Sequence, residues 1–160
     1  METKSSNKTS GLDLKKIFRC MMEDGHYPSF EHTHIQFDIG DNIGVVECED
    51  GIVSVRLFFS IEKEAYKIFL EASNMTMVET FMVKPVVLED MKNIMFSCEM
   101  FCDTISQFRR FLPRSIAFLK EALAVHRSEM QKLVLAHEVA SKAVPATEDL
   151  ITGTGRKILS

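Results

Sequence analysis

The feature that most constrains this fold is an alternation of apolar and polar residues between positions 34 and 61. Ile35, Phe37 and Ile39 alternate with polar residues, which is the period of a half-buried β-strand. Two more strand-like runs follow, and the pair Asp50-Gly51 between them is typical of a tight hairpin. The pattern predicts a three-stranded antiparallel meander with one face in a hydrophobic core.

Helical patterns flank this meander on both sides. An opening helix is predicted over residues 12–24, where apolar residues recur every three or four positions and Gly25 ends the pattern. Residues 26–29 are expected to form a connector, because Pro28 favours extended backbone before it. After the meander, residues 62–74 are predicted to form a short helix with Asn74 as its C-terminal cap.

A second pair of strands is predicted beyond that helix. Residues 76–88 form a long strand-like run. Pro85 within the run implies an edge position or a bulge, since proline cannot donate a hydrogen bond to a neighbouring strand. Residues 94–102 alternate again and are predicted to be the next strand, after a turn at residues 89–92.

The last predicted element is a long helix. Its apolar stripe runs from Ile105 to His137 at spacings of three or four residues, and Asp103 or Thr104 is expected to cap its start. Pro113 lies inside the stripe and is expected to kink or restart the helix, because proline removes a backbone hydrogen bond.

The predicted order is therefore helix, three strands, helix, two strands, helix. Strands and helices are partly segregated, which favours an α+β fold: an antiparallel five-stranded sheet with helices packed on it and a long C-terminal helix. A chain of 160 residues has material for one domain. We expect that domain over residues 11–137, with a disordered tail at 1–10 and a mobile or partner-ordered tail at 138–160.

Charge and cysteine content narrow the classes of function. Lysine and arginine number 19 against 23 acidic residues, a net charge of −4, so the chain lacks the basic footprint of a nucleic-acid binder. Neither a secretory signal nor a run of about 20 apolar residues that would span a membrane is visible. We therefore expect a cytoplasmic protein with reduced, mostly buried cysteines. These cysteines are Cys20, Cys48, Cys98 and Cys102.

The order of elements resembles the YbjN family and the type III secretion chaperones, which share one chaperone-like fold. The resemblance covers about residues 12–130 and rests on the opening helix 12–24, the meander 35–61, the helix 63–74, the hairpin 78–101 and the closing helix from Thr104. It implies a non-enzymatic protein-interaction domain. The secretion chaperones are often dimers that hold an unfolded effector segment, and YbjN-like proteins are described as candidate sensory-transduction regulators. The longer last helix and the tail after it depart from the family pattern.

No catalytic motif stands out in the chain. It contains no glycine-rich phosphate loop, nucleophile elbow or paired-histidine zinc helix. His32 and His34, with His26 nearby, would suit a metal on one strand face, but the plainer interpretation is exposed polar residues where a strand starts. Cys98 and Cys102 would lie ~13 Å apart along one strand, too far for a disulfide, and are interpreted as core thiols.

A basic cluster is the first candidate for binding a partner. Arg109, Arg110 and Arg114 surround Pro113 in the closing helix. Such a cluster either docks an acidic peptide or phosphate, or forms the solvated face of an amphipathic helix.

A surplus of apolar residues in the strands is the second candidate. Ten methionines, several of them near the second hairpin, either adapt to varied partners or fill the core. Phe58, Phe81, Met95 and Phe101 fall outside the predicted core face, where a sheet with one wet face needs no large apolar residue.

We therefore predict a non-enzymatic interaction module, either chaperone-like or a regulatory adaptor, that holds a peptide or protein partner on a surface rich in Met and Phe. It is expected to be a homodimer without cofactor or metal, and to bind neither nucleic acid nor membrane. The alternatives are a homo-oligomeric assembly domain without a client, and a small metal-binding protein that uses the histidines at the start of the first strand. The predicted partner-binding residues are Phe58, Phe81, Met95, Phe101, Arg109, Arg110 and Arg114.

Overall fold

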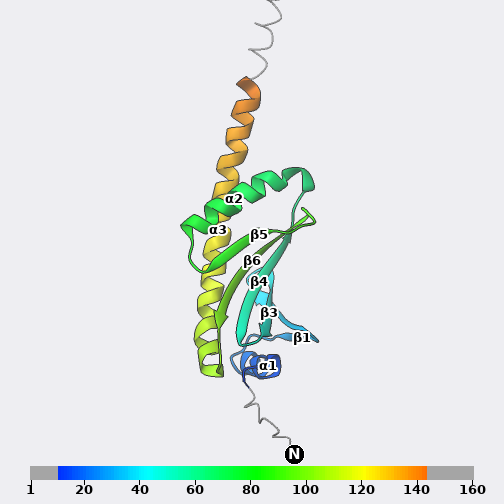
Figure 1. Cartoon of the computed structure of the whole chain (residues 1–160), viewed down its shortest axis with the longest axis vertical. Helices are drawn as coiled ribbons and strands as arrows, with labels where there is room; N and C mark the ends of the chain where they lie inside the picture. The colour runs from blue at the N-terminus through cyan, green and yellow to red at the C-terminus, as the bar shows by residue number, and fades with distance from the viewer. Residues whose placement is uncertain (1–10, 144–160) are drawn as a thin grey trace, which may run out of the picture.

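The computed structural model describes residues 11–143 and builds them around one antiparallel sheet (Figure 1). Six strands lie in this part of the chain, in the spatial order β1-β2-β3-β4-β6-β5. The mixed α+β class and the long C-terminal helix are confirmed. The strands are β1 (Ser29–Glu31), β2 (His34–Ile39), β3 (Asn42–Glu49), β4 (Ile52–Ser60), β5 (Val83–Val87) and β6 (Asn93–Phe101).

The sixth strand corrects the predicted five-stranded sheet. β1 pairs with β2, Ser29 opposite Gln36 and Glu31 opposite His34. It starts at the last residue of the predicted connector 26–29 and continues where no strand was predicted. All three residues of β1 are exposed. A strand with no buried face has no apolar alternation, so the pattern that revealed the other strands is missing here.

The helix before β5 is longer than predicted. A short 3-10 turn, η1 (Lys63–Ala65), leads into α2 (Tyr66–Glu79), so the residues 76–79 that were predicted as strand are helical. Thr76 is fully buried, and its Oγ1 donates to the carbonyl oxygen of Ala72 at 2.7 Å. Burial of Thr76 outweighs the strand-like composition of this turn, although its neighbours Met77 and Val78 are exposed. Pro85 does lie in an edge strand, because β5 ends the sheet.

One helix of 39 residues, α3 (Ile105–Ala143), closes the fold, and it continues through Pro113 without restarting. Thr104 caps it, since its Oγ1 accepts from the backbone N–H of Gln107 at 3.2 Å. Leu112 and Leu119 are buried on either side of the exposed Pro113, so packing holds the helix in line across the missing hydrogen bond. The predicted tails at 1–10 and 144–160 lie outside the described residues, whereas residues 138–143 belong to α3.

The core lies between one face of the sheet and the helices α1 (Leu14–Glu23) and α3. Val55 and Leu57 of β4 and Phe96 of β6 are buried against Phe108 and Leu119 of α3. α2 packs beside β5 and against α3, and Figure 1 shows the last turns of α3 extending past it. Within residues 11–143, no helix combines the length and the apolar character required to cross a membrane.

Gly44 gives a test of how tightly this core is packed. A Cβ at this position of β3 would lie 2.6 Å from Ile39 Cδ1 and 2.8 Å from Phe37 Cε1, both of buried side chains. Gly44→Ala is therefore expected to lower the free energy of unfolding by about 1–3 kcal/mol, as measured by urea denaturation. Gly11→Ala is the control, because no atom lies within 4 Å of its added Cβ. Equal stability of both variants would show that the packing around Gly44 is loose.

Candidate functional site

The sheet face opposite the helices carries a charge network at its centre. Arg56 of β4 pairs with Glu47 of β3 and, at 3.6 Å, with Glu99 of β6. Glu99 also accepts from Lys84 Nζ at 2.9 Å, and this hydrogen bond lowers the pKa of its carboxyl group. The two acids and the two bases satisfy one another, so this part of the face offers no free charge to a ligand.

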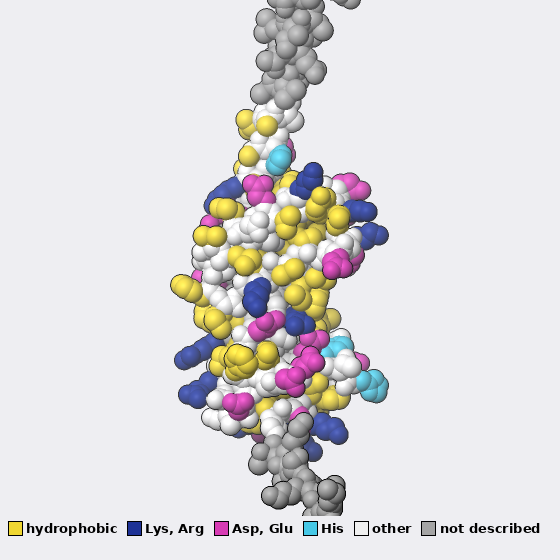
Figure 2. All heavy atoms as spheres, in the orientation of Figure 1, with side chains coloured by type: hydrophobic (Ala, Val, Ile, Leu, Met, Phe, Trp, Pro, Cys, Tyr) yellow, Lys and Arg dark blue, Asp and Glu magenta, His cyan; other side chains and the backbone are white. Residues whose placement is uncertain are grey.

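Apolar residues lie on both sides of this network. In the strand register, Phe58 stands opposite Met95, and Met95 stands opposite Val86, which forms an apolar row at one end of the face. Phe101 lies at the other end, opposite Ile52. In Figure 2, hydrophobic side chains likewise form separate groups, with charged side chains between them.

The larger apolar group lies where α2 ends, β5 begins and β6 ends, and we call it the methionine corner. Phe81 is 77% exposed and Phe101 is 75% exposed, although both are large aromatic residues. A depression of about 460 Å³ lies beside Phe101, with Met77 and Met82 also in its lining, and Phe81 directly precedes Met82 in the chain. Because exposed apolar patches of this kind mark interaction sites, the corner is the strongest candidate surface of the described residues. The methionine corner comprises Ile52, Met77, Val78, Phe81, Met82, Met100 and Phe101.

Two of the three predicted arginines border the corner. Arg110 and Arg114 are exposed on successive turns of α3 and make no ion pair or side-chain hydrogen bond within residues 11–143. They line a second hollow, also of about 460 Å³, together with Phe111 and Phe118. Met82 and Met100 line both hollows, so the two free cations are continuous with the methionine corner.

Arg109 has a different environment from its two neighbours. Its Nη2 lies 2.6 Å from Glu23 Oε2, and its Nε lies 3.1 Å from Asp24 Oδ2, so it ties α3 to the end of α1. The hydrogen bond to Asp24 and the nearby negative charges raise the pKa of its guanidinium group. The structure therefore separates Arg109, engaged within the domain, from Arg110 and Arg114, which are available to a partner.

The cysteines are placed as thiols of the core. All four are free, and Cys98, at the floor of the second hollow, is fully buried. Burial and then the charge of Glu99 raise the pKa of the Cys98 thiol to about 11. At neutral pH it is protonated and a poor nucleophile.

The histidines at the start of the sheet do not converge on one point. His34 lies between Thr33 and Gln36, within 3.2 Å of Thr33 Oγ1, and His26 packs edge-on against Phe37. Within residues 11–143 there is no group of three or more His, Cys, Asp or Glu side chains arranged to hold a metal ion. The metal-binding alternative gains no support from this arrangement.

His126 is the polar core residue that sequence reasoning did not single out. It occupies one position of the helical stripe in α3 but is only 6% exposed, stacked on Phe69 of α2 and edge-on to Phe96 of β6. Ser73 Oγ lies 3.3 Å from its Nε2. Desolvation by burial lowers the pKa of this imidazole, and a hydrogen bond with the backbone of Phe69 opposes the shift. The neutral ring is part of the α2–α3 contact.

The architecture and surface define an α+β domain with a YbjN-like fold. No family model matches the chain, and no curated protein matches it in sequence. Among solved structures it is similar to YbjN of E. coli, described as a candidate transcription regulator, with a TM-score of 0.61 and 11% identity over 76% of this chain and 94% of that one. It is also similar to an uncharacterized protein from Methanothermobacter thermautotrophicus, with a TM-score of 0.53 and 16% identity over 76% of this chain and 98% of that one. The predicted YbjN resemblance is thus confirmed for the fold.

Burial of His126 predicts how stability depends on pH. The folded state disfavours the protonated ring, whereas the unfolded chain binds that proton below about pH 6.5. The free energy of unfolding is therefore expected to be fully retained above pH 6.5 and to fall below it, by at most about 1.4 kcal/mol per pH unit. Urea titrations between pH 7.5 and 5.5 measure this slope.

Two variants assign the slope to its source. His126→Phe should flatten the stability profile between pH 7.5 and 5.5, whereas His137→Phe, at an exposed position of the same helix, should leave it unchanged. A slope that survives in His126→Phe would show that another group carries the dependence. The lowered pKa of the Glu99 carboxyl affects stability only at lower pH, since that contribution is lost as pH falls below about 4.5.

Proposed function

We propose that this protein is a non-enzymatic interaction module, a chaperone-like or regulatory adaptor, that binds an apolar and acidic peptide segment of another protein at the methionine corner. The observation that carries the proposal is the exposure of Phe81, Phe101 and their neighbours Met77 and Met82, which no other residue between positions 11 and 143 covers. Methionine side chains adapt to varied partners, and large exposed aromatic groups supply binding energy once buried.

Charge complementarity specifies the partner further. Arg110 and Arg114 have no acidic partner of their own within residues 11–143, in contrast to Arg109 and Arg56. A segment with an apolar side chain on Met82 and Met100 and a carboxylate within reach of the two guanidinium groups would satisfy both hollows. The YbjN-like fold supports a regulatory rather than a catalytic role by analogy alone.

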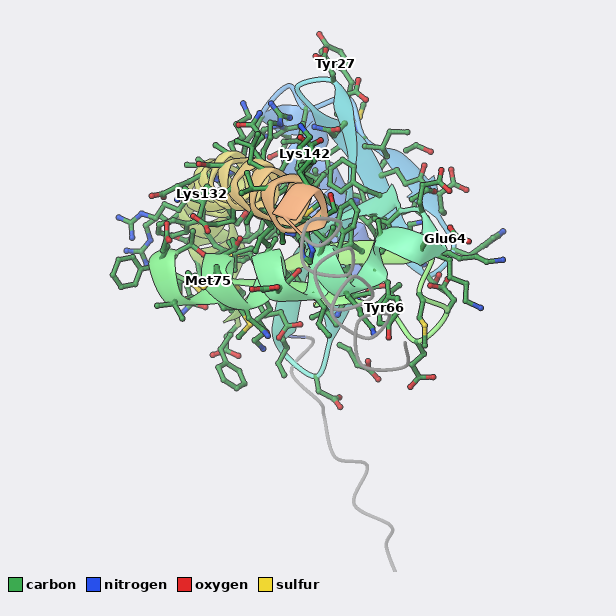
Figure 3. All side chains as sticks on the ribbon, turned by 90° about the horizontal axis from the view of Figure 1, so that it is seen from above. Tyr27, Glu64, Tyr66, Met75, Lys132 and Lys142 are labelled. Atoms are coloured by element: carbon green, nitrogen blue, oxygen red, sulfur yellow. The ribbon has the colours of Figure 1, made fainter. Side chains whose placement is uncertain are left out.

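The experiment that tests this proposal is position-specific photo-cross-linking. The full chain is made with p-benzoylphenylalanine at Phe81, at Phe101 or at Tyr27, and is irradiated in lysate of its source cells. Tyr27 is the control, because it is 88% exposed and lies on a different side of the molecule from Met75 of α2 (Figure 3). We expect the same protein to be captured from positions 81 and 101 but not from position 27.

A charge variant makes the result specific to the proposed surface. Combining Arg110→Glu with Arg114→Glu should reduce that capture at least about tenfold. Two positive charges that attract the acidic segment are then replaced by two negative charges that repel it. Glu substitution of the exposed Lys120, which lies further along α3, is the matched control and should preserve it. Capture that is equal from position 27, or that is indifferent to the arginine variants, would refute the assignment of this surface.

A second candidate function, homo-oligomeric assembly, is favoured by the end of α3. Val134, Leu135 and Val139 are 41%, 62% and 70% exposed on turns that extend beyond the domain. A lone helix of this kind gains little stability without packing, so a second copy of the chain is a suitable cover.

Light scattering across protein concentration tests the assembly function. Leu135→Lys with Val139→Lys should convert an oligomer of the full chain to monomer, whereas Lys substitution of the exposed Ala124 on the same helix should not. A monomer at all concentrations in the unmodified protein would remove this candidate, and so would an oligomer that survives the double substitution.

A further inference from the structure

A hollow of about 360 Å³ lies near the start of α2, whereas the methionine corner lies near its end. It lies between the end of β4, the start of α2 and the middle of α3, with Phe59, Phe69 and Phe96 in its walls. The rings of Phe59 and Phe96 meet edge-on with centroids 5.9 Å apart. The hollow is an aromatic-lined cleft of the size at which small-molecule sites begin.

Apolar side chains that are only partly buried show that the cleft is not closed by the protein itself. Phe59, Phe69, Leu123 and Met130 all line it and are all intermediate in exposure. Each would lose further contact with water if a flat apolar group entered between them. That burial is the main source of affinity available to this site.

The polar groups of the cleft differ in what they can offer. His126 is neutral at pH 7, and its Nε2 is engaged with Ser73, so it presents a ring face and no charge. Arg127, the next residue of α3, lies at the exposed rim. Its guanidinium group makes no ion pair or hydrogen bond with any other residue between positions 11 and 143. No Asp or Glu lines the cleft, and Arg127 is the one charged side chain among its lining residues at pH 7.

We propose that this cleft binds a small aromatic carboxylate, with the ring between Phe59, Phe69 and Leu123 and the carboxylate paired with Arg127. Each part of such a ligand complements one feature of the cleft. The ring buries the half-exposed apolar walls, and the carboxylate supplies the partner that Arg127 lacks among residues 11–143. This site is separate from the methionine corner, and the inference does not depend on the interaction proposed there.

Binding is tested with 4-phenylbutanoate and its neutral analogue 4-phenylbutanamide as the actual probes. Calorimetry on the full chain should give saturable binding of the acid with a Kd below about 1 mM, which is reasonable for a ligand of this size. Amide shifts in ¹⁵N–¹H spectra should concentrate on Phe59, Phe69 and Arg127. Absence of saturation, or shifts that concentrate elsewhere, would overturn the proposal.

Three variants separate the contribution of the Arg127 charge to binding from that of the apolar cleft. Arg127→Gln should weaken the acid at least about fivefold and leave the amide unchanged, because only the acid uses the charge. Lys120→Gln removes one exposed positive charge from the same helix away from the cleft and should affect neither probe. Ser60→Trp places a large ring at the exposed rim and should abolish binding of both probes while circular dichroism confirms the fold. The proposal fails if Lys120→Gln matches Arg127→Gln, or if both probes still bind to Ser60→Trp.

Discussion

The ladder between β4 and β6 is the constraint on which the rest of this structure depends. All nine residues of β4, from Ile52 to Ser60, stand opposite residues of β6, although η1, α2 and β5 lie between the two strands in the sequence. This non-local pairing places β6 inside the sheet and forces β5 to the edge, where Pro85 is tolerated. It also aligns Val55 and Leu57 with Cys98 and Phe96, so that α3 meets one continuous apolar face.

The parts of the fold that were predictable are those in which burial leaves a regular trace in the sequence. The strands β2, β3 and β4 carry alternating apolar residues because one side of each packs in the core, and the long stripe of α3 has the helical period for the same reason. β1 was missed because none of its residues is buried. The end of α2 was misplaced because Thr76 and its neighbours have a strand-like composition, and only the tertiary burial of Thr76 selects the helix.

The candidate site shows the limit of the same reasoning. Surplus aromatic residues were recognisable from the alternation, but the register alone places Phe58 and Phe101 at opposite ends of the sheet face. Arg109, Arg110 and Arg114 lie close together in the sequence and look equivalent there. Their helical positions differ: Arg109 pairs with Asp24, the C-terminal cap of α1, whereas Arg110 and Arg114 line a hollow. Such distinctions arise from contacts between residues more than 80 positions apart, which no local pattern encodes.

The packing of α2 explains why the aromatic-lined cleft and the hollow at the methionine corner are separate. Its buried side is made of small and polar residues, Ala72, Ser73 and Thr76, so it approaches α3 closely at its middle. The larger apolar residues are left toward its two ends, where Phe69 borders the cleft and Met77 borders the methionine corner. At the middle, the Ser73 hydroxyl donates to the carbonyl oxygen of Phe69 and lies 3.3 Å from Nε2 of His126, and buried polar groups bonded in this way are costly to disrupt. The buried central contact between α2 and α3 therefore separates the two surfaces, which lie toward the two ends of α2.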